Sequence, residues 1–500
     1  MINYTSTRNN AIKEKAFTAI TQGISKDGGL FVPAEIPIIS DNELNDMISM
    51  NYNQRAKLVL SKYLTDFTED EISFCVDNAY TKEKFGSDNP APVVSLSDTM
   101  SVLELWHGPT CAFKDMALQI LPHLLAVSSQ KTGDDKEIII LVATSGDTGK
   151  AALEGFKDAK GTKILVFYPD SGVSAMQCRQ MNTQEGGNVA VCAIKGNFDD
   201  AQTGVKKIFT DKSVNQRLAD KGMSFSSANS INLGRLLPQV VYYFSSYCEL
   251  IEKGEIKVGE KINFVVPTGN FGNILAGYYA YKMGLPVKKL ICASNKNNIL
   301  TDFIDSGSYD RKREFYTTVS PSMDILISSN LERLLFDIYD KDSDAVSDLM
   351  DKLKNDGKYT VSPQIRERLS DMFCGGFCDD TKTKARIKDT FEKYGYLCDT
   401  HTAVAVEVYN QYLEKTGDKT KTVVASTASP YKFASSVLEA FGKSEETDEF
   451  KQLDELFEIS KMGIPTPISE LKGKAIRFNN LCTADTMEEK VFELLDLQRR

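Results

Sequence analysis

Six short runs of apolar residues constrain the fold of this chain more than any other feature of its sequence. They are rich in β-branched residues and lie at 137–143, 163–168, 189–194, 262–267, 289–294 and 422–427. Most of them lead into a loop with glycine and then into a segment of helical character. Such continuous apolar runs are typical of strands buried on both faces of a parallel sheet. The sequence therefore predicts an open α/β protein whose ligands bind beyond the carboxyl ends of the strands.

Three stretches lie outside this alternation. Residues 1–95 are predicted to form a mostly helical N-terminal domain that ends near a proline-containing loop. The polar stretch at about 301–385 contains helical pieces and is interpreted as an insertion in the larger sheet domain. Residues 441–500 begin with an acidic segment and are interpreted as a helical C-terminal extension.

Composition and charge narrow the choice of partners. The 500 residues carry 59 Lys and Arg against 69 Asp and Glu, a net charge of −10 without a basic block. An acidic chain of this kind argues against nucleic acid or an anionic membrane as the main partner. Any anionic ligand must then be held by a local group of donors and cations.

Cysteine and histidine usage indicates a reduced protein without a metal site. The ten Cys are scattered, and the closest pair, Cys374 and Cys378, has no His near it. The chain has three His, and zinc-site spacings are absent. The run 138–143 is too short to cross a bilayer, and the first residues lack the apolar stretch of a secretory signal. We therefore expect a cytoplasmic protein.

Two glycine-containing loops approach nucleotide-binding motifs but fail on their details. GDTGK at 146–150 matches the end of a P-loop, yet Ala151 replaces the Ser or Thr that binds magnesium, and Thr144 replaces the first glycine. TGNFGN at 268–273 has two residues between its glycines and so lacks the dinucleotide pattern G-x-G-x-x-G. Nucleotide chemistry is disfavoured.

The same loops fit the binding of anions. In TGNFGN, Gly269 and Gly272 let backbone amides close around an anion at the start of a helix, where the helix dipole adds positive potential. ATSGDTG at 143–149 has the same position after a strand and offers three hydroxyls and backbone amides to a carboxylate. On its residues alone, TGNFGN also fits an ordinary turn between a strand and a helix. Two anion sites would suit one ligand with two anionic groups, or a cofactor and a substrate.

Lys114 is a candidate nucleophile. It begins a predicted helix whose apolar stripe contains Met116, Ile120, Leu124 and Val127. A lysine in an apolar helix entry loses solvation, which lowers its pKa and frees its amine for Schiff-base chemistry. A surface lysine remains the alternative, and the adjacent Asp115 fits a carboxylate stabilised by the helix dipole.

The three histidines carry weaker signals. His107 fits a proton shuttle or a structural, hydrogen-bonded residue, and His123 is assigned to packing. No role is assigned to His401, in DTHTAV.

Eight segments together carry a resemblance to a known family. They are YTSTRNN with KDGGLFVPAEIP, ELWHGPTCAFKD, ATSGDTGKAAL, NSINLGRLLPQVVYYF, VPTGNFGNILAGYYA, SPSMDILISSNLERLLF, DTHTAV and STASPYKF. In this order, between residues 4 and 433, the sequence closely resembles the threonine synthase family in its longer bacterial and fungal form. These are enzymes of the tryptophan-synthase-β-like fold that use pyridoxal 5'-phosphate (PLP).

The resemblance implies a domain division and the cofactor contacts. It implies two open, doubly wound sheet domains, a large one at 96–125 and 235–440 and a small one at 126–234. Lys114 in AFKD would form the Schiff base with the cofactor. The loop residues Gly269, Asn270, Phe271, Gly272 and Asn273 would hold the cofactor phosphate. Thr427 would place a hydroxyl against the pyridine nitrogen.

The resemblance also implies the substrate contacts. The carboxylate would bind the loop Thr144, Ser145, Gly146, Asp147 and Thr148, and the substrate phosphate would meet Asn229, Ser230, Asn232 and Arg235. Two departures are Leu233, where many relatives carry an aromatic residue, and Ser429, where many carry His.

The implied reaction converts O-phospho-L-homoserine and water to L-threonine and phosphate, the last step of threonine biosynthesis, in a monomer or homodimer. One alternative is a threonine or serine dehydratase or a sulfhydrylase of the same fold. Another is a catalytically silent threonine-synthase-like binding protein. Phosphate release from O-phosphohomoserine discriminates among them.

Overall fold

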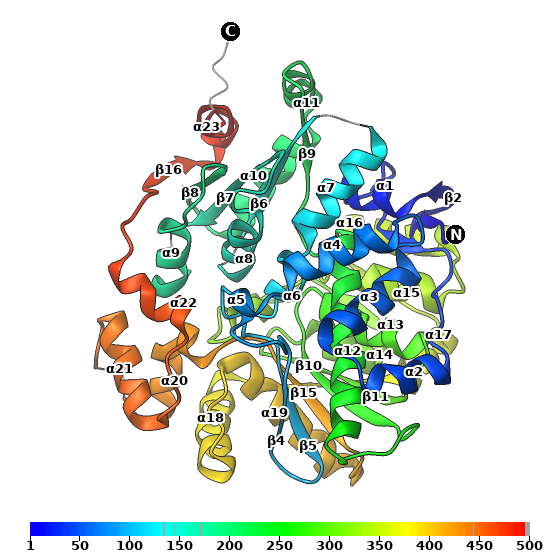
Figure 1. Ribbon diagram of the computed structural model, residues 1–500, viewed down its shortest axis with the longest axis vertical. Coiled ribbons are helices and arrows are strands. Elements are labelled where there is room, and N and C mark those ends of the chain that lie inside the picture. The colour runs from blue at the N-terminus through cyan, green and yellow to red at the C-terminus, as the bar shows by residue number, and fades with distance from the viewer. Residues whose placement is uncertain (134–135, 145, 171–172, 444, 496–500) are drawn as a thin grey trace.

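Two sheets organise the chain, as a computed structural model shows for residues 1–133, 136–144, 146–170, 173–443 and 445–495. The larger sheet, in the lower half of Figure 1, has the order β14 (Phe373–Phe377), β11 (Val287–Ser294), β10 (Ile262–Pro267), β15 (Thr422–Ser426), β5 (Met100–Glu104) and β4 (Val93–Ser95). The second sheet, above it, has the order β16 (Asn480–Thr483), β8 (Val189–Lys195), β7 (Thr162–Pro169), β6 (Glu137–Ala143) and β9 (Met223–Ser226). All neighbouring strands in both sheets are parallel except the pair of β4 and β5. The predicted α/β class is confirmed, and all six apolar runs form strands.

Both sheets are covered on both faces, which explains their continuous apolar sequences. Along β10, Phe264 and Val266 join the core beneath α12 (Leu233–Glu252) and α13 (Gly272–Lys282), whereas Val265 joins the core beneath α19 (Thr400–Thr416). Along β6, Ile140 faces the first of these cores, and Ile139 faces α10 (Phe198–Thr210) and α11 (Lys212–Ala219). Successive side chains of a strand point to opposite faces, so most residues of these runs are apolar.

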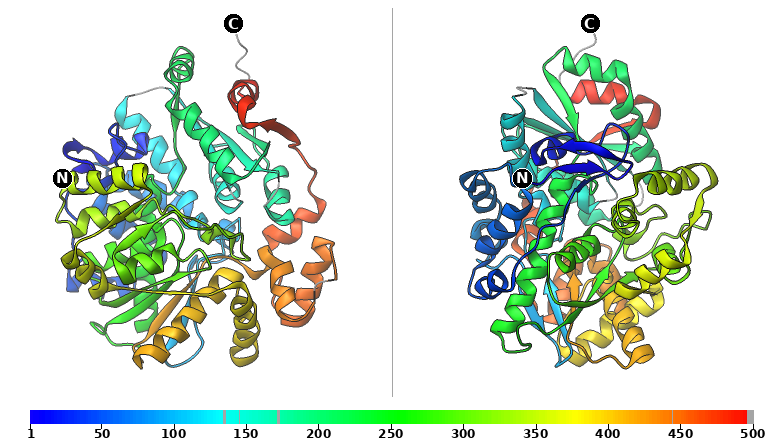
Figure 2. Two further views of the ribbon diagram at one scale, coloured as in Figure 1. Left: turned by 180° about the vertical axis from the view of Figure 1, so that it is seen from behind. Right: turned by 90° about the vertical axis from the view of Figure 1, so that its right-hand side faces the viewer.

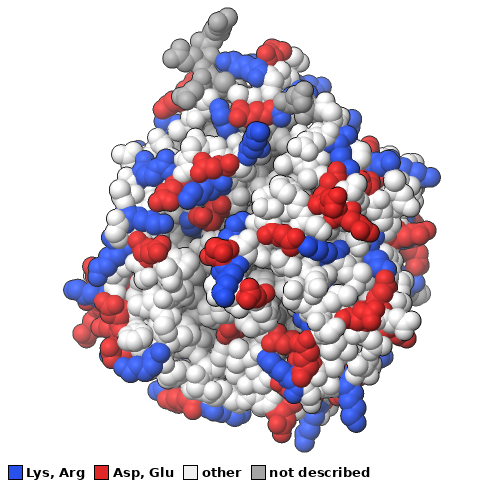
Figure 3. Space-filling model, in the orientation of Figure 1, with Lys and Arg blue, Asp and Glu red and all other residues white. Residues whose placement is uncertain are grey.

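Further helices surround the sheets. Those around the second sheet are α7 (Leu121–Thr132), α8 (Asp147–Phe156) and α9 (Ala175–Asn182). Those around the larger sheet are α14 (Ile299–Ser306), α15 (Leu331–Ile338), α16 (Ser343–Asp356), α17 (Pro363–Met372), α18 (Asp380–Tyr394) and α20 (Ala434–Ala440). Acidic and basic side chains are interspersed on the face of the molecule drawn in Figure 3.

The N-terminal region contains more than helices. Its helices are α1 (Ala16–Gln22), α2 (Asp41–Ile48), α3 (Tyr52–Tyr63), α4 (Glu69–Ala79) and α5 (Lys82–Phe85). Strands β1 (Tyr4–Ser6), β2 (Asn9–Glu14) and β3 (Phe31–Pro33) form an antiparallel sheet, and β2 contacts α16 (Figure 2). Two of these strands have only three residues, so no alternating pattern predicts them.

Two stretches expected outside the sheets each supply an edge strand. Strand β14 comes from the stretch 301–385 and extends the larger sheet, and β12 (Ser308–Asp310) and β13 (Lys358–Thr360) pair within the same stretch. The C-terminal stretch contains α21 (Glu449–Ser460), α22 (Thr466–Ser469) and α23 (Met487–Leu494), and its β16 extends the second sheet. A purely helical extension was therefore the wrong expectation.

The helix predicted after Lys114 is divided. Helix α6 (Asp115–Leu118) ends after one turn, and α7 begins at Leu121 with Pro122 in its first turn. Proline lacks the amide proton that a helix interior uses and is best tolerated in a first turn, although α12 also contains Pro238. The helix that begins after Lys114 is therefore interrupted at Gln119 and Ile120. Within the described part of the chain, no helix has the length and apolar character needed to cross a membrane.

The contact between α6 and α8 gives a test of this packing. A Cβ added to Gly155 of α8 would collide with the backbone carbonyl of Leu118 in α6. Gly155→Ala should lower the free energy of unfolding by about 1–3 kcal/mol, because a well-packed core tolerates added volume poorly. Urea denaturation measures it. Gly473→Ala, which has open space around its Cβ, is the control, and equal loss in both variants would contradict the packing argument.

Candidate functional site

Lys114, Asp147, Ser322 and Lys432 meet where strands of both sheets end. Asp147 begins α8 after β6 of the second sheet, whereas Lys114 lies in the segment between β5 and α6 of the larger sheet. Lys432 lies in the short helical turn Pro430–Phe433 that follows β15. The carboxyl ends of parallel strands are where open α/β proteins bind ligands.

Lys114 is not a surface lysine. Its side chain is 11% exposed, and its Nζ lies 3.3 Å from Ser322 Oγ and 3.6 Å from Asp147 Oδ2. Burial lowers the pKa of Lys114, and the nearby cations of Lys432 and Arg235 lower it further, although Asp147 acts in the opposite direction. Such an environment favours the uncharged amine that nucleophilic chemistry needs.

Asp147 is the carboxylate that the cations share. Lys432 Nζ lies 2.7 Å from its Oδ1, and Gln177 Nε2 donates to the same oxygen at 2.8 Å. Ser322 Oγ donates to Oδ2 at 3.3 Å. Burial alone would raise the pKa of Asp147, but the two lysines and Gln177 hold it well below its usual range. Asp147 is therefore a buried anion with its charge already bound.

His401 holds Ser322 in place. Its Nε2 accepts a hydrogen bond from the backbone amide of Ser322 at 3.2 Å, and its Nδ1 lies 2.7 Å from Asp399 Oδ2. Asp399 also caps α19 by accepting from the amides of His401 and Thr402. This chain of contacts gives His401 the position that the sequence left open.

Lys432, Ser322 and Gln177 were missed by the sequence interpretation. Lys432 and Ser322 lie in two of the segments that carry the resemblance, STASPYKF and SPSMDILISSNLERLLF. No local spacing relates them to Lys114, because the contacts join distant parts of the chain.

The loop 268–273 turns its carbonyls away from the start of α13. The carbonyl of Gly269 accepts from Ser328 Oγ at 2.8 Å, and that of Asn270 accepts from the amide and the side chain of Asn330. Phe271 has a left-handed backbone with φ 63° directly before α13. A Cβ on Gly269 would lie 2.6 Å from the carbonyl oxygen of Ser322, so glycine is required there.

Asn273 adds an unused donor to this loop. Its Oδ1 accepts from the hydroxyls of Tyr242 and Tyr243, both at 2.7 Å. Its Nδ2 is buried and has no hydrogen-bond partner among the described residues. A buried donor without a partner costs free energy, and an anion bound at the loop would satisfy it.

The loop after β6 is arranged differently from the prediction. Thr144 Oγ1 accepts from the amides of Gly146 and Gly149, at 3.0 Å and 2.9 Å. The expectation of free amides is wrong at these two positions, because the first turn of α8 is capped by the loop's own threonine. Ser145 lies outside the described residues, and Thr148 is half-buried.

In the loop before α12, the side chain of Asn232 is bound within the protein, whereas Asn229 and Ser230 are partly exposed. Asn232 is fully engaged: its Oδ1 accepts from the amide of Gly234, and its Nδ2 donates to the carbonyls of Ile20 and Ser227. These contacts make it a helix cap and contradict its prediction as a phosphate contact. Asn229 and Ser230 are half-buried.

Arg235 differs from Asn232 because part of its guanidinium is unused. Its Nη1 donates to the carbonyl of Ala228 at 2.9 Å, whereas its buried Nε has no partner in the described part of the chain. Burial lowers the pKa of Arg235 to about 10, so it stays a cation at neutral pH. It is a buried positive charge near Lys114 that an anionic ligand would compensate.

Thr427 and His107 lie on the same side of the larger sheet. The carbonyl of Thr427 accepts from the amide of Phe113 at 2.8 Å, which places this buried threonine next to Lys114 in space. His107 Nε2 lies 2.7 Å from Glu104, and its ring stacks on Trp106. These contacts favour the structural interpretation of His107.

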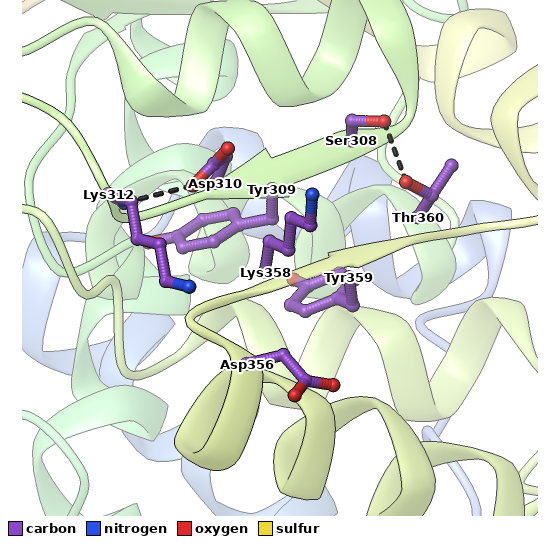
Figure 4. A pocket seen from close by; sticks show the side chains of 8 residues that line it. All are labelled: Ser308, Tyr309, Asp310, Lys312, Asp356, Lys358, Tyr359 and Thr360. Carbon is purple, nitrogen blue, oxygen red and sulfur yellow. Dashed lines mark hydrogen bonds between the residues drawn. The ribbon is translucent and has the colours of Figure 1, made fainter.

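A separate hollow of about 550 Å³ is lined by residues of β12, β13 and the segments next to them, and none of these is among the residues above (Figure 4). Its lining consists of Ser308, Tyr309, Asp310, Lys312, Asp356, Lys358, Tyr359 and Thr360. Within the described residues, no three His, Cys, Asp or Glu side chains gather to hold a metal ion.

Comparison with known proteins agrees across nearly the whole chain. The family model for the threonine synthase N terminus matches residues 3–80, that for pyridoxal-phosphate dependent enzymes matches 102–428, and that for the threonine synthase C-terminal region matches 402–484. Threonine synthase of Saccharomyces cerevisiae is 37% identical over 462 residues, which cover 87% of this chain and 88% of that protein. Human threonine synthase-like 1 is 40% identical over 432 residues. They cover 84% of this chain but 57% of the human protein, so the chain spans less than two thirds of its length.

A solved structure gives the same result. The crystal structure of PLP-bound threonine synthase from Brucella melitensis has a TM-score of 0.87 and 35% sequence identity, and the match covers 99% of both chains.

The residues at the strand ends fit a cofactor with an aldehyde and a phosphate. Lys114 offers a buried amine to the aldehyde, and Asn273 offers an unpaired donor to the phosphate, at the start of α13 where the helix dipole favours an anion. Thr427, whose hydroxyl is predicted to meet the ring nitrogen, has its backbone carbonyl bound to the amide of Phe113, the residue before Lys114.

Asn273→Asp tests the phosphate loop. The change keeps an oxygen for the two tyrosine hydroxyls but replaces the unpaired donor with an acceptor. Because hydrogen bonds to charged groups contribute about 1.5–3 kcal/mol, affinity for PLP should fall roughly tenfold or more. Titration of cofactor-stripped protein with PLP, followed by absorbance, measures this. The control is Asn42→Asp, an exposed asparagine on α2, and an equal loss in both variants would rule out a specific role for Asn273.

Proposed function

The chain belongs to the threonine synthase family, and from this premise we propose that it converts O-phospho-L-homoserine and water to L-threonine and phosphate. Its cofactor is pyridoxal 5'-phosphate, and the reaction would make it a carbon–oxygen lyase. The observation that carries the proposal is a buried amine, Lys114, beside a buried guanidinium, Arg235, that has an unused donor. The first suits the cofactor, and the second suits a substrate with a phosphate of its own.

Pyridoxal phosphate supplies an electron sink that stabilises negative charge on substrate carbon. Lys114 holds the cofactor and, as a free amine, takes and returns protons at the substrate's α and β carbons. Its low solvation and the neighbouring cations lower the pKa of the amine, which favours the uncharged form that can accept a proton. Thr427 offers a neutral hydroxyl to the ring nitrogen, which favours the unprotonated ring.

Arg235 is proposed to bind the phosphate that leaves, together with Asn229 and Ser230. A planar guanidinium gives two parallel hydrogen bonds to a phosphate. Asn232 supports this loop as a cap rather than as a ligand.

The substrate carboxylate is proposed to meet the loop at 144–148. Asp147 itself would repel a second carboxylate, so its contribution is to hold the two lysines. The hydroxyl of Thr144 is already bound to backbone amides of the loop. Thr148, half-buried at the start of α8, is therefore the hydroxyl that we propose for the carboxylate.

We also propose the domain division 1–95, 96–125 with 235–440, 126–234 and 441–500. The first boundary, after residue 95, lies within a few residues of the start of the larger sheet at β4 and β5. Strands β6 to β9, from the proposed small domain, all belong to the second sheet. The ten free cysteines support action in the reducing cytoplasm on a small molecule. For its oligomeric state we propose a monomer or a homodimer.

The direct test is product formation. Purified protein with PLP should release phosphate and threonine in equal amounts from O-phosphohomoserine, and borohydride should fix the cofactor on the peptide containing Lys114. Lys114→Ala should lower the rate about a hundredfold or more, because positioned acid–base groups contribute 10²–10⁴-fold. Lys352→Ala, an exposed lysine on α16, is the control. Ammonia and keto acid as main products, or fixation on another lysine, would refute the proposal.

Arg235 separates this reaction from those of substrates without phosphate. Arg235→Ala should lower kcat/KM roughly ten- to a hundredfold, at about 1.4 kcal/mol per tenfold, while PLP remains bound. Arg235→Lys should restore part of the loss, since it keeps the charge but not the planar fork. Steady-state kinetics and PLP occupancy are measured for each variant. Unchanged kcat/KM, or loss of PLP in Arg235→Ala, would remove Arg235 from the substrate site.

A further inference from the structure

Lys432 is a buried cation that the proposed reaction does not use. Its side chain is fully buried, its Nζ lies 2.7 Å from Asp147 Oδ1, and it donates to the carbonyl of Thr110 at 2.9 Å. A lysine side chain loses rotamer freedom and hydration when it is buried. Its contacts therefore have to compensate for both.

Both contacts of Lys432 lead back to Lys114. Asp147 is the carboxylate beside Lys114, with Oδ2 3.6 Å from its Nζ. Thr110 lies in the segment before Lys114, and its amide and hydroxyl both donate to Asp115, the residue after Lys114. Lys432 thus binds two groups near the Lys114 amine: the carboxylate of Asp147 and the backbone carbonyl of Thr110.

The charges show why a second lysine is needed. Asp147 is fully buried and has two ammonium groups as ion-pair partners, one on each oxygen. When Lys114 is an uncharged amine, Asp147 and Lys432 still form a complete buried ion pair. Without Lys432, the carboxylate would have Lys114 as its sole close cation, and an unpaired buried charge is strongly unfavourable. Lys114 would then be held as an ammonium.

We propose that Lys432 is a positioning residue that binds Asp147 and so leaves Lys114 available as an uncharged amine. The proposal rests on the role of Lys114 in the proposed function. Ser322 completes the arrangement, because its Oγ lies between Lys114 and Asp147 and its backbone is held by His401. The charged groups that act on Lys114 are Asp147, Lys432 and Arg235, and of these Lys432 is the cation bound directly to the carboxylate.

The sign of the effect follows from these charges. Burial and the two cations lower the pKa of Lys114, whereas Asp147 raises it. Removing the charge of Lys432 should raise the pKa of Lys114, and removing that of Asp147 should lower it. A charge within about 4–6 Å shifts a pKa by about 1–3 units, so the two single variants should move in opposite directions by about one unit or more.

The experiment measures the reactivity of the Lys114 amine against pH. Full-length protein is stripped of cofactor with hydroxylamine and labelled with a trace of acetic anhydride, and acetylation of the Lys114 peptide is followed by mass spectrometry. Lys432→Met should raise the midpoint by about one pH unit or more, and Asp147→Asn should lower it by a similar amount. Lys432→Met with Asp147→Asn should return it toward the wild-type value. Lys432→Arg should stay close to wild type, because the charge is kept.

A purely structural role for Lys432 predicts another pattern. Single and double variants would then lose thermal stability and PLP binding alike, without opposite shifts of the midpoint, and this result would overturn the proposal. If Lys432→Met does not fold, Lys432→Gln removes the charge but keeps a polar side chain, and an unchanged midpoint in that variant would overturn the proposal. A midpoint for Asp147→Asn that is unchanged or raised, or a midpoint for Lys432→Arg displaced as far as about one unit, would also overturn it.

Failure of the proposed function has a different signature. It would appear in the wild-type protein, as absence of a borohydride-fixed cofactor on Lys114 or of phosphate release. The labelling midpoints require neither a bound cofactor nor phosphate release, since they report only on the reactivity of the Lys114 amine. As a second readout, Lys432→Met should recover PLP at neutral pH roughly tenfold more slowly than wild type, because about one pH unit of midpoint shift lowers the uncharged fraction tenfold.

Discussion

The buried carboxylate of Asp147 is the constraint on which the site depends. It comes from the second sheet, and both lysines that bind it come from segments of the larger sheet. Paired buried charges stabilise a fold little, but separating them costs several kcal/mol. Arrangements of the two sheets that separate these charges are therefore disfavoured. The apolar cores supply the driving force for folding, and the ion pairs select the geometry.

Close packing around two glycines holds the segments that carry Asp147 and Lys114. A Cβ on Gly149, one turn into α8, would collide with Thr144, and one on Gly108 would lie 2.5 Å from a carboxylate oxygen of Asp115. Asp115 is fully buried and accepts from the amide and hydroxyl of Thr110, although burial still raises its pKa to about 6. The turns on both sides of Lys114 are thus set by contacts between backbone and side chain. The backbone of Lys114 is therefore held on both sides, and the amine can move only through the torsions of its own side chain.

How much of this the sequence predicts depends on how local each signal is. The six central strands follow from burial on both faces, because most residues of each run are apolar, and the glycine loops follow from their position after strands. Strands β14 and β16 lie at sheet edges and have weak apolar patterns, so they were missed. The free amides predicted after β6 were wrong because Thr144 caps the helix. No rule of spacing relates Lys432 or Ser322 to Lys114, since their contacts form only when distant segments pack.

The N-terminal region makes hydrogen bonds that hold the loop before α12 and the loop before α13. Ile20 and Thr21, at the end of α1, accept hydrogen bonds from Asn232 and Ser226, which flank the loop before Arg235.

Arg333 makes the second connection. It is fully buried, donates from Nε to the carbonyl of Phe31 at 3.0 Å, and also binds Asn330 and the carbonyl of Ile231. Asn330 in turn holds the carbonyl of Asn270 in the loop before α13. One guanidinium therefore joins β3, the substrate loop and the cofactor loop. All of these donors are directed at backbone or amide oxygens. The N-terminal region is in this sense part of the site, although none of its residues contacts Lys114 in the described structure.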